Sequence, residues 1–122
     1  MTATRAVVGG LLLVIAVPAG AGQSLAMRVS PSFSYAPATL IVQLSIEPDA
    51  GNRVVRVVAE SADFYRSSDL PLDGDHAART SVVSYVGLPA GDYEVRSMLF
   101  SVSGRVRATA VQNMTVMGDG GQ

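Results

Sequence analysis

Cysteine, lysine and tryptophan are absent from this 122-residue sequence, and histidine occurs only once. Without cysteine the chain has no disulfide, and a lipid-modified N-terminal cysteine is excluded. With no sign of a stabilising metal either, the hydrophobic core has to stabilise the fold by itself. All nine basic residues are arginine, and ten acidic residues balance them. This near-neutral charge provides no broad basic field for nucleic acid or for an anionic membrane surface.

Long apolar runs are also lacking, with one exception at the N-terminus. Arg5 precedes the apolar segment Ala6–Val17, and Pro18 and several small residues follow it. This order is typical of a secretory signal peptide, with cleavage expected after Ala21 or after Ala26. We therefore expect residues 1–26 to be a leader and the mature protein to be exported, either periplasmic or secreted. The protein would contact a membrane only through this leader, if it stays uncleaved.

The rest of the chain lacks a helical stripe and shows strand patterns instead. Apolar residues alternate with polar ones before a turn-forming cluster at Pro48–Asn52, and a β-branched run follows this turn. The segment Glu60–Ser68 fits either a short strand or an irregular crossing, and Leu70–His76 is expected to be a loop. The expected strands are Leu40–Ile46, Arg53–Ala59, Thr80–Val86, Tyr93–Val102 and Arg105–Met117.

Short strands at regular spacing, separated by turn signals, predict an all-β sandwich. We expect a single antiparallel β-sandwich of about seven strands over residues 27–117. The remaining residues, 118–122, are expected to form a flexible tail.

The segment Leu88–Val95 (LPAGDYEV) is the most specific motif. Leu88 is expected to fill the core at the end of one strand, and Pro89 and Gly91 to turn the chain. Tyr93 would then enter the next strand pointing inward, where its hydroxyl needs a hydrogen-bond partner. The backbone of the preceding turn can supply that partner.

This motif resembles the tyrosine corner between the fifth and sixth strands of immunoglobulin-like and fibronectin type III-like domains. The resemblance implies an Ig-like sandwich of the kind found in exported bacterial proteins. Because the sequence lacks a cysteine pair and tryptophan, it departs from antibody-type domains. The same Leu-Pro-x-Gly-x-Tyr phrase also resembles transthyretin-like modules, which are β-sandwiches as well.

A hairpin is expected at the end of the chain, with Ser103-Gly104 as a two-residue turn. That register pairs Phe100 with Arg107. If Tyr93 points into the core, the opposite face of the hairpin carries exposed apolar side chains flanked by arginine. Aromatic residues, methionine and arginine are enriched in protein interfaces. The predicted protein-binding residues are Met98, Phe100, Val102, Arg105, Arg107 and Val111, and Arg56 between Val54 and Val58 would extend this surface. A one-residue slip or bulge would instead turn these residues into ordinary core.

Catalytic patterns are scarce. His76 is the only histidine, no serine lies in a strand-to-helix elbow, and no phosphate-binding glycine loop precedes a helix. The acids Asp69, Asp73 and Asp75 near His76 do not have the spacing of a calcium loop. Met98, Met114 and Met117 are better explained by packing than as soft metal ligands. We therefore predict no enzymatic activity, no cofactor and no metal site.

Two functions remain open on this basis. The favoured hypothesis is a non-enzymatic exported module that binds another envelope or secreted protein. The alternative is a small-ligand or metal-ion carrier that uses the acidic loop around His76. Self-association through exposed edge strands is a third possibility.

Overall fold

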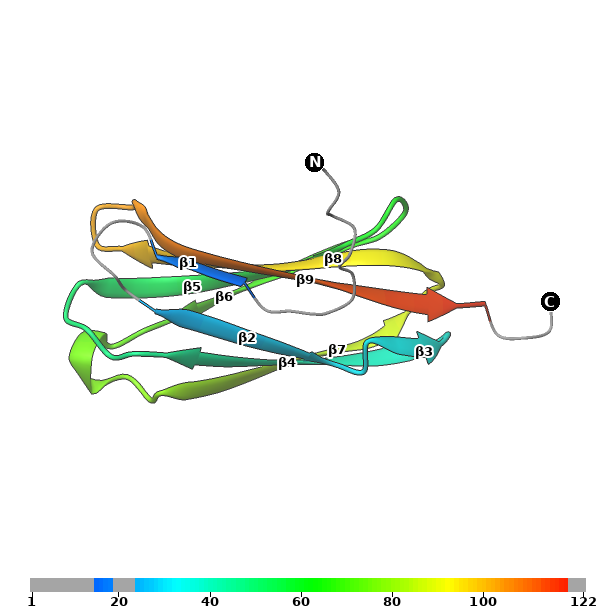
Figure 1. Ribbon diagram of the computed structural model, residues 1–122, viewed down its shortest axis with the longest axis horizontal. Helices are drawn as coiled ribbons and strands as arrows, with labels where there is room; N and C mark the ends of the chain where they lie inside the picture. The colour runs from blue at the N-terminus through cyan, green and yellow to red at the C-terminus, as the bar shows by residue number, and fades with distance from the viewer. Residues whose placement is uncertain (1–14, 19–23, 119–122) are drawn as a thin grey trace, which may run out of the picture.

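The computed structural model describes residues 15–18 and 24–118, and in this part of the chain it shows two facing β-sheets (Figure 1). The one helical element among them is a single 3-10 turn, η3 (Gly74–His76), and none of the described residues form a helix that could cross a membrane. The strands are β1 (Ile15–Pro18), β2 (Leu25–Ser30), β3 (Phe33–Tyr35), β4 (Ala38–Ile46), β5 (Asn52–Glu60), β6 (Tyr65–Pro71), β7 (Thr80–Leu88), β8 (Gly91–Ser101) and β9 (Val106–Met117).

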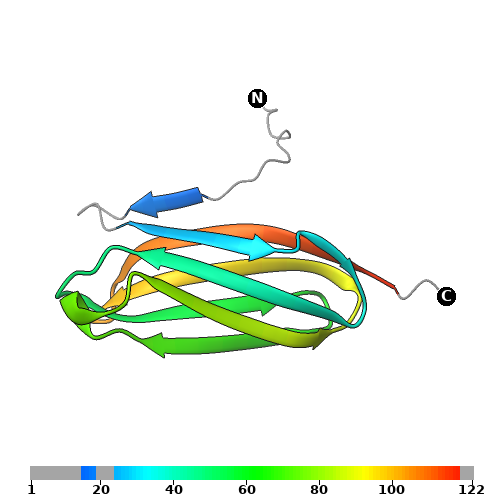
Figure 2. The ribbon, with the colours of Figure 1, turned by 90° about the horizontal axis from the view of Figure 1, so that it is seen from below.

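The strands divide unequally between the sheets. The larger sheet has the order β1-β9-β8-β5-β6, and β3 pairs with another part of β9. The smaller sheet has the order β2-β4-β7 and lies face to face with it (Figure 2). All neighbouring strands run antiparallel except β3, which runs parallel to β9. Strand β8 is the centre of the larger sheet, between β5 and β9.

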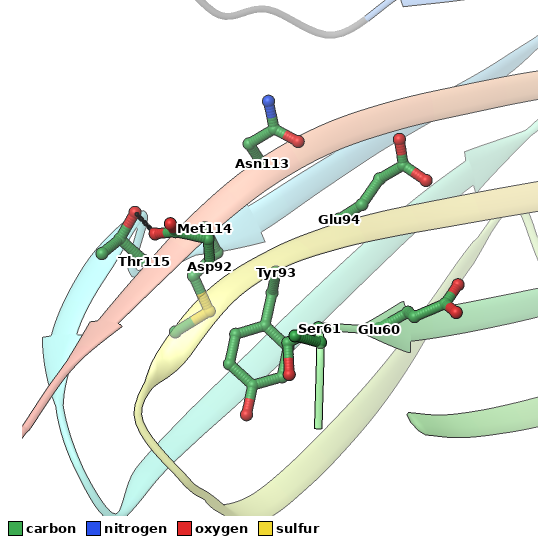
Figure 3. Close-up of a pocket in the computed structure, with 9 residues that line it drawn as sticks. Glu60, Ser61, Asp92, Tyr93, Glu94, Asn113, Met114 and Thr115 are labelled. Atoms are coloured by element: carbon green, nitrogen blue, oxygen red, sulfur yellow. Dashed lines mark hydrogen bonds between the residues drawn. The ribbon is translucent and has the colours of Figure 1, made fainter. Parts of the chain in front are cut away.

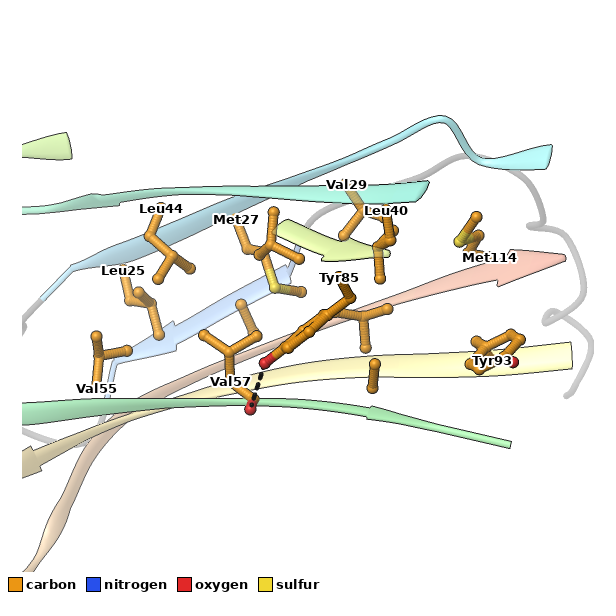
Figure 4. Packing of buried hydrophobic residues seen from close by; sticks show 14 of the residues in the cluster. Leu25, Met27, Val29, Leu40, Leu44, Val55, Val57, Tyr85, Tyr93 and Met114 are labelled. Atoms are coloured by element: carbon orange, nitrogen blue, oxygen red, sulfur yellow. Dashed lines mark hydrogen bonds between the residues drawn. The ribbon is translucent and has the colours of Figure 1, made fainter. Parts of the chain in front are cut away.

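The core lies between the two sheets and follows from the alternation of side chains along each strand. In β4 every second side chain is buried, from Ala38 to Ile46, while those between them are partly or fully exposed. Burying one such valine or leucine contributes about 1.5–3 kcal/mol. Figure 4 shows these side chains meeting those of the larger sheet. The cluster includes Leu25, Met27, Leu40, Leu44, Val55, Val57, Val95, Leu99 and Met114.

Two tyrosines each place a hydroxyl group inside this apolar layer, and each hydroxyl has a hydrogen-bond partner there. Tyr85 on β7 reaches across to the larger sheet, where its hydroxyl contacts the Val57 carbonyl at 3.3 Å (Figure 4). The same hydroxyl lies 2.9 Å from Ser68 Oγ. Tyr93 on β8 is 2% exposed and donates to the Pro89 carbonyl at 2.7 Å. Burial raises the pKa of both phenols, because the phenolate would lose its hydration.

The corner residues singled out in the sequence lie together around this bond. Leu88 is fully buried at the end of β7, and Pro89 supplies the accepting carbonyl. Gly91 is closely packed, because a Cβ added there would lie 3.3 Å from the side chain of Ser61. The arrangement therefore joins the two sheets at the β7–β8 turn.

Several expected boundaries differ from those observed. The ambiguous segment after Glu60 forms a connection and then β6, which continues through Pro71 into the expected loop. Leu70 explains the longer strand, because its side chain packs against the core. Strand β2 begins at Leu25, before the expected domain start at residue 27. Residues 1–14 and 19–23 of the expected leader and residues 119–122 of the expected tail lie outside the described residues.

The Tyr93 hydroxyl gives a direct test of the corner. We expect Tyr93→Phe to lower the free energy of unfolding by about 1 kcal/mol, because the Pro89 carbonyl loses its donor. Chemical denaturation would measure the change. The matched control is Tyr65→Phe at an exposed phenol. Equal stability of the two variants would show that the corner bond contributes nothing.

Candidate functional site

The outer face of the larger sheet carries most of the sequence-predicted binding residues. Along β8, Tyr93, Ser97 and Leu99 are buried between the sheets. Because strand side chains alternate, Met98 and Phe100 point to the opposite side, away from the smaller sheet. Both are partly buried there rather than fully exposed.

The hairpin register agrees with the sequence prediction in the middle of the strands and differs near the turn. Met98 lies opposite Thr109 as expected, but Phe100 lies opposite Val106 and not opposite Arg107. A register shift between Leu99 and Phe100 causes the difference. The connection is also longer than two residues: strand β8 ends at Ser101 and β9 begins at Val106. The predicted Ser103-Gly104 turn was therefore wrong.

Arg107 has a structural environment that the sequence did not predict. Its side chain is 19% exposed, and its guanidinium donates to Asp49 at 3.0 Å and to the buried Asn52 at 2.8 Å. The Gly51 N–H, and then Arg107, stabilise the Asp49 carboxylate and lower its pKa. A Cβ on Gly51 would lie 2.7 Å from the guanidinium, so glycine leaves room for it. Arg107 thus ties β9 to the β4–β5 turn.

Arg56 lies on the outer face, where its guanidinium contacts both the Phe100 ring and the Asp69 carboxylate. Its guanidinium carbon is 5.4 Å from the centre of the Phe100 ring. The same group donates two hydrogen bonds to Asp69, at 2.8 and 3.2 Å. These bonds lower the pKa of Asp69 and raise that of Arg56. Asp69 therefore belongs to strand β6 and this ion pair, and not to a cluster around His76.

Apolar neighbours surround Phe100 and Met98. Val54 lies opposite Phe100 on one side and Val106 on the other, and Val106 is 44% exposed. Val111 lies one row further along, opposite Arg96. We call this set the outer-face patch; its members are Val54, Met98, Phe100, Val106 and Val111. Val58, on the same face of β5, is buried without belonging to the core between the sheets.

Val102 and Arg105 lie beside the patch rather than within it. Both are exposed residues of the β8–β9 connection, and Val102 is among the most exposed apolar side chains of the described residues. The turn is closed by backbone bonds between Ser101 and Gly104 and between Ser101 and Arg105. The six predicted binding residues therefore do not form one surface. Three are partly buried strand residues of the patch, two are exposed in the β8–β9 connection, and Arg107 is bound to the β4–β5 turn.

The opposite end of the outer face is acidic. An open depression of about 630 Å³ lies over the ends of β5, β8 and β9, and Figure 3 shows the residues around it. Arg96 donates to Glu94 at 2.6 Å and to Glu60 at 3.2 Å, and these bonds raise its pKa, with Glu94 the larger cause. Thr115 donates to Asp92 at 3.3 Å. The lining residues are Glu60, Ser61, Ala62, Asp92, Tyr93, Glu94, Asn113, Met114 and Thr115.

The loop around His76 forms a smaller depression of about 330 Å³. His76 is highly exposed, and its Nε2 lies 3.7 Å from Asp75. Among residues 15–18 and 24–118, no group of three or more His, Cys, Asp or Glu side chains is placed to hold a metal ion. Met114 is in the core and Met98 is on the outer face, so these two side chains lie on opposite sides of the sheet.

Two exposed features were missed in the sequence. Val106 belongs to the patch only because of the register shift next to Phe100. Phe33 and Tyr35 on β3 are both more than half exposed and stack edge to face, with ring centres 5.6 Å apart. Their F-x-Y spacing was a usable signal for a strand with both rings on one face.

Phe100 and its neighbour Leu99 provide a paired test of the two faces. We expect Phe100→Ser to lower the free energy of unfolding by about 1 kcal/mol, since the ring is only partly buried. Leu99→Ala should cost about 2–5 kcal/mol, because it opens a cavity in the core. Urea denaturation would measure both. Equal losses would mean that Phe100 is part of the core.

Comparisons with known proteins support the architecture. No protein-family model and no curated protein matches the sequence. Among solved structures, the chain is similar to a superoxide reductase (neelaredoxin) from Ignicoccus hospitalis, with a TM-score of 0.60 and 9% identity over 75% of this chain and 79% of that one. It is also similar to the PmoD soluble domain from Methylocystis sp. ATCC 49242 (Rockwell), with a TM-score of 0.52 and 15% identity over 78% of this chain and 92% of that one. At these identities the likeness shows the β fold alone.

Proposed function

We propose that this chain is an exported, non-enzymatic Ig-like module that binds another envelope or secreted protein through its outer-face patch. The observation that carries the proposal is the row of apolar side chains from Val54 through Phe100 to Val106, on a sheet face turned away from the core. Arginine, methionine and phenylalanine together have the composition of an interface centre.

The strand order supports the Ig-like assignment. Omitting β1 and the short β3, the first, second and fifth strands form one sheet, and the third, fourth, sixth and seventh form the other. The tyrosine corner lies between the fifth and sixth of these strands, where Ig-like sandwiches have it. A transthyretin-like module is the alternative for the same motif.

Charged side chains near the outer-face patch would favour one orientation of a bound partner. Arg105 is exposed in the β8–β9 connection, and Asp92 and Glu94 are exposed at the other end of β8. A partner with an apolar centre and the opposite order of charges would be steered into one orientation.

The absence of an activity is also part of the proposal. One structural neighbour is named as an enzyme, yet 9% identity transfers no active site. The carrier alternative has less support, because Asp69 is bound to Arg56 and is not available to the His76 loop.

The proposed export can be tested by identifying the first residue of the mature protein. Cleavage after Ala26 would remove Leu25, which is fully buried in the core, whereas cleavage after Ala21 leaves β2 whole. We therefore expect the protein recovered from its host to begin at Gly22. Intact-mass measurement of a chain tagged after Gln122 would show this. A product that keeps Met1 would contradict export with cleavage, and one that begins at Met27 would contradict the choice of site.

Affinity capture from the host envelope and medium tests the binding face. The tagged wild-type chain should recover a partner in stoichiometric amount. Phe100→Ser should weaken the affinity for that partner at least about tenfold, equivalent to 1.4 kcal/mol. The matched control is Val86→Ser, at an exposed valine on the smaller sheet, and it should keep the partner. Loss in both variants, or in neither, would contradict this face as the binding site.

A further inference from the structure

Strand β9 has β8 on one side, and two different segments share its other edge. Strand β3 pairs in parallel with Thr115–Met117, and β1 pairs antiparallel with Ala108–Val111 (Figure 1). Strand β3 belongs to the domain. Strand β1, however, lies entirely within the segment that the sequence assigns to the leader. If the leader is removed, the edge at Ala108–Val111 loses its partner strand.

This part of the edge lacks three of the features that usually prevent strand addition, namely charge, proline and a bulge. Ala108–Val111 contains no charge and no proline, and the register shift of the hairpin lies outside it. Ala108 and Ala110 are buried in the core, and Thr109 and Val111 are partly buried on the outer face. The unpaired N–H and C=O groups of such an edge can pair with an added strand.

We propose that the Ala108–Val111 edge of β9 is a strand-acceptor site, vacated by the leader and then paired by an extended, uncharged segment of a partner protein. The pairing of β1 shows what the edge accepts, an antiparallel strand in the register Ile15 opposite Val111 through Pro18 opposite Ala108. Recognition by strand addition obtains affinity from main-chain hydrogen bonds. The proposal rests on the proposed export and leader cleavage, but not on the outer-face patch.

A second copy of the chain is the other possible occupant of this edge. Two β9 strands paired antiparallel about Thr109 and Ala110 would place Val106, the first residue of β9, opposite Asn113 of the other copy. That pairing ends before Thr115, where β3 begins to pair with β9, so the oligomeric state of the chain has to distinguish the two occupants.

Amide hydrogen exchange can test the site on a chain that begins at Gly22. This chain keeps the whole core cluster, which runs from Leu25 to Val116, and should therefore fold. The probe is a synthetic peptide of residues 14–19 flanked by lysines. The control peptide is N-methylated at the positions of Ala16 and Val17, which removes whichever of these two N–H groups would pair with β9.

In the Gly22 chain we expect the outward amides of Ala108–Val111 to exchange faster than in the full chain. The peptide should slow them by about tenfold at ten times its dissociation constant, and the methylated peptide should not. Equal protection of these amides with and without the leader would overturn the proposal, as would failure of the peptide to slow exchange. A Gly22 chain that elutes as a dimer with these amides protected would also overturn it, in favour of a second copy.

The outer-face variant separates this proposal from the proposed function. Phe100→Ser should leave the peptide effect unchanged, because Phe100 lies opposite Val106, outside the accepting segment. Peptide pairing retained in a variant that loses the captured partner supports strand addition at β9 that does not require Phe100. Loss of the peptide effect in Phe100→Ser would contradict a site confined to the β9 edge.

Discussion

The hydrogen bond from Tyr93 to the Pro89 carbonyl determines which face of β8 is the core. A buried hydroxyl without a partner is costly, and the β7–β8 turn supplies one at 2.7 Å. Shifting β8 by one residue would expose Tyr93 and place Glu94 between the sheets. The corner therefore selects one register, and the side chains of β8 alternate from that point.

Because β8 is the central strand of the larger sheet, its alternation extends to both neighbours. Val57 of β5 and Ala110 of β9 lie opposite Ser97 and share its buried face. Met98 and Phe100 share the other face with Arg56 and Val111. The register of β8 that places Tyr93 in the core therefore also places apolar side chains and an arginine on the outer face of the sheet. Tyr85 holds the smaller sheet against it from β7.

At each end of the larger sheet, an arginine is held by hydrogen bonds to neighbouring side chains. Arg107 is held by Asp49 and Asn52 at the β4–β5 turn, and Arg96 is held between Glu60 and Glu94. Both arginines therefore stabilise turns and neighbouring strands, where an interface prediction from composition alone would count them as binding groups. Arg56 differs because its guanidinium lies over the Phe100 ring at the edge of the patch.

The sequence by itself determined the strand periods and the corner. Alternation in β4, the turn residues after it and the Leu88–Tyr93 motif are local patterns, so they predict strands and a sandwich without knowledge of long-range contacts. Only the tertiary structure decided the pairing of Phe100 with Val106, because a register shift is a property of two strands and not of one. The same holds for Asp69 and Arg107, whose partners lie 13 and at least 55 residues away in the chain. Contacts at such separations depend on how the sheets assemble, and a single sequence carries no periodic signal for them.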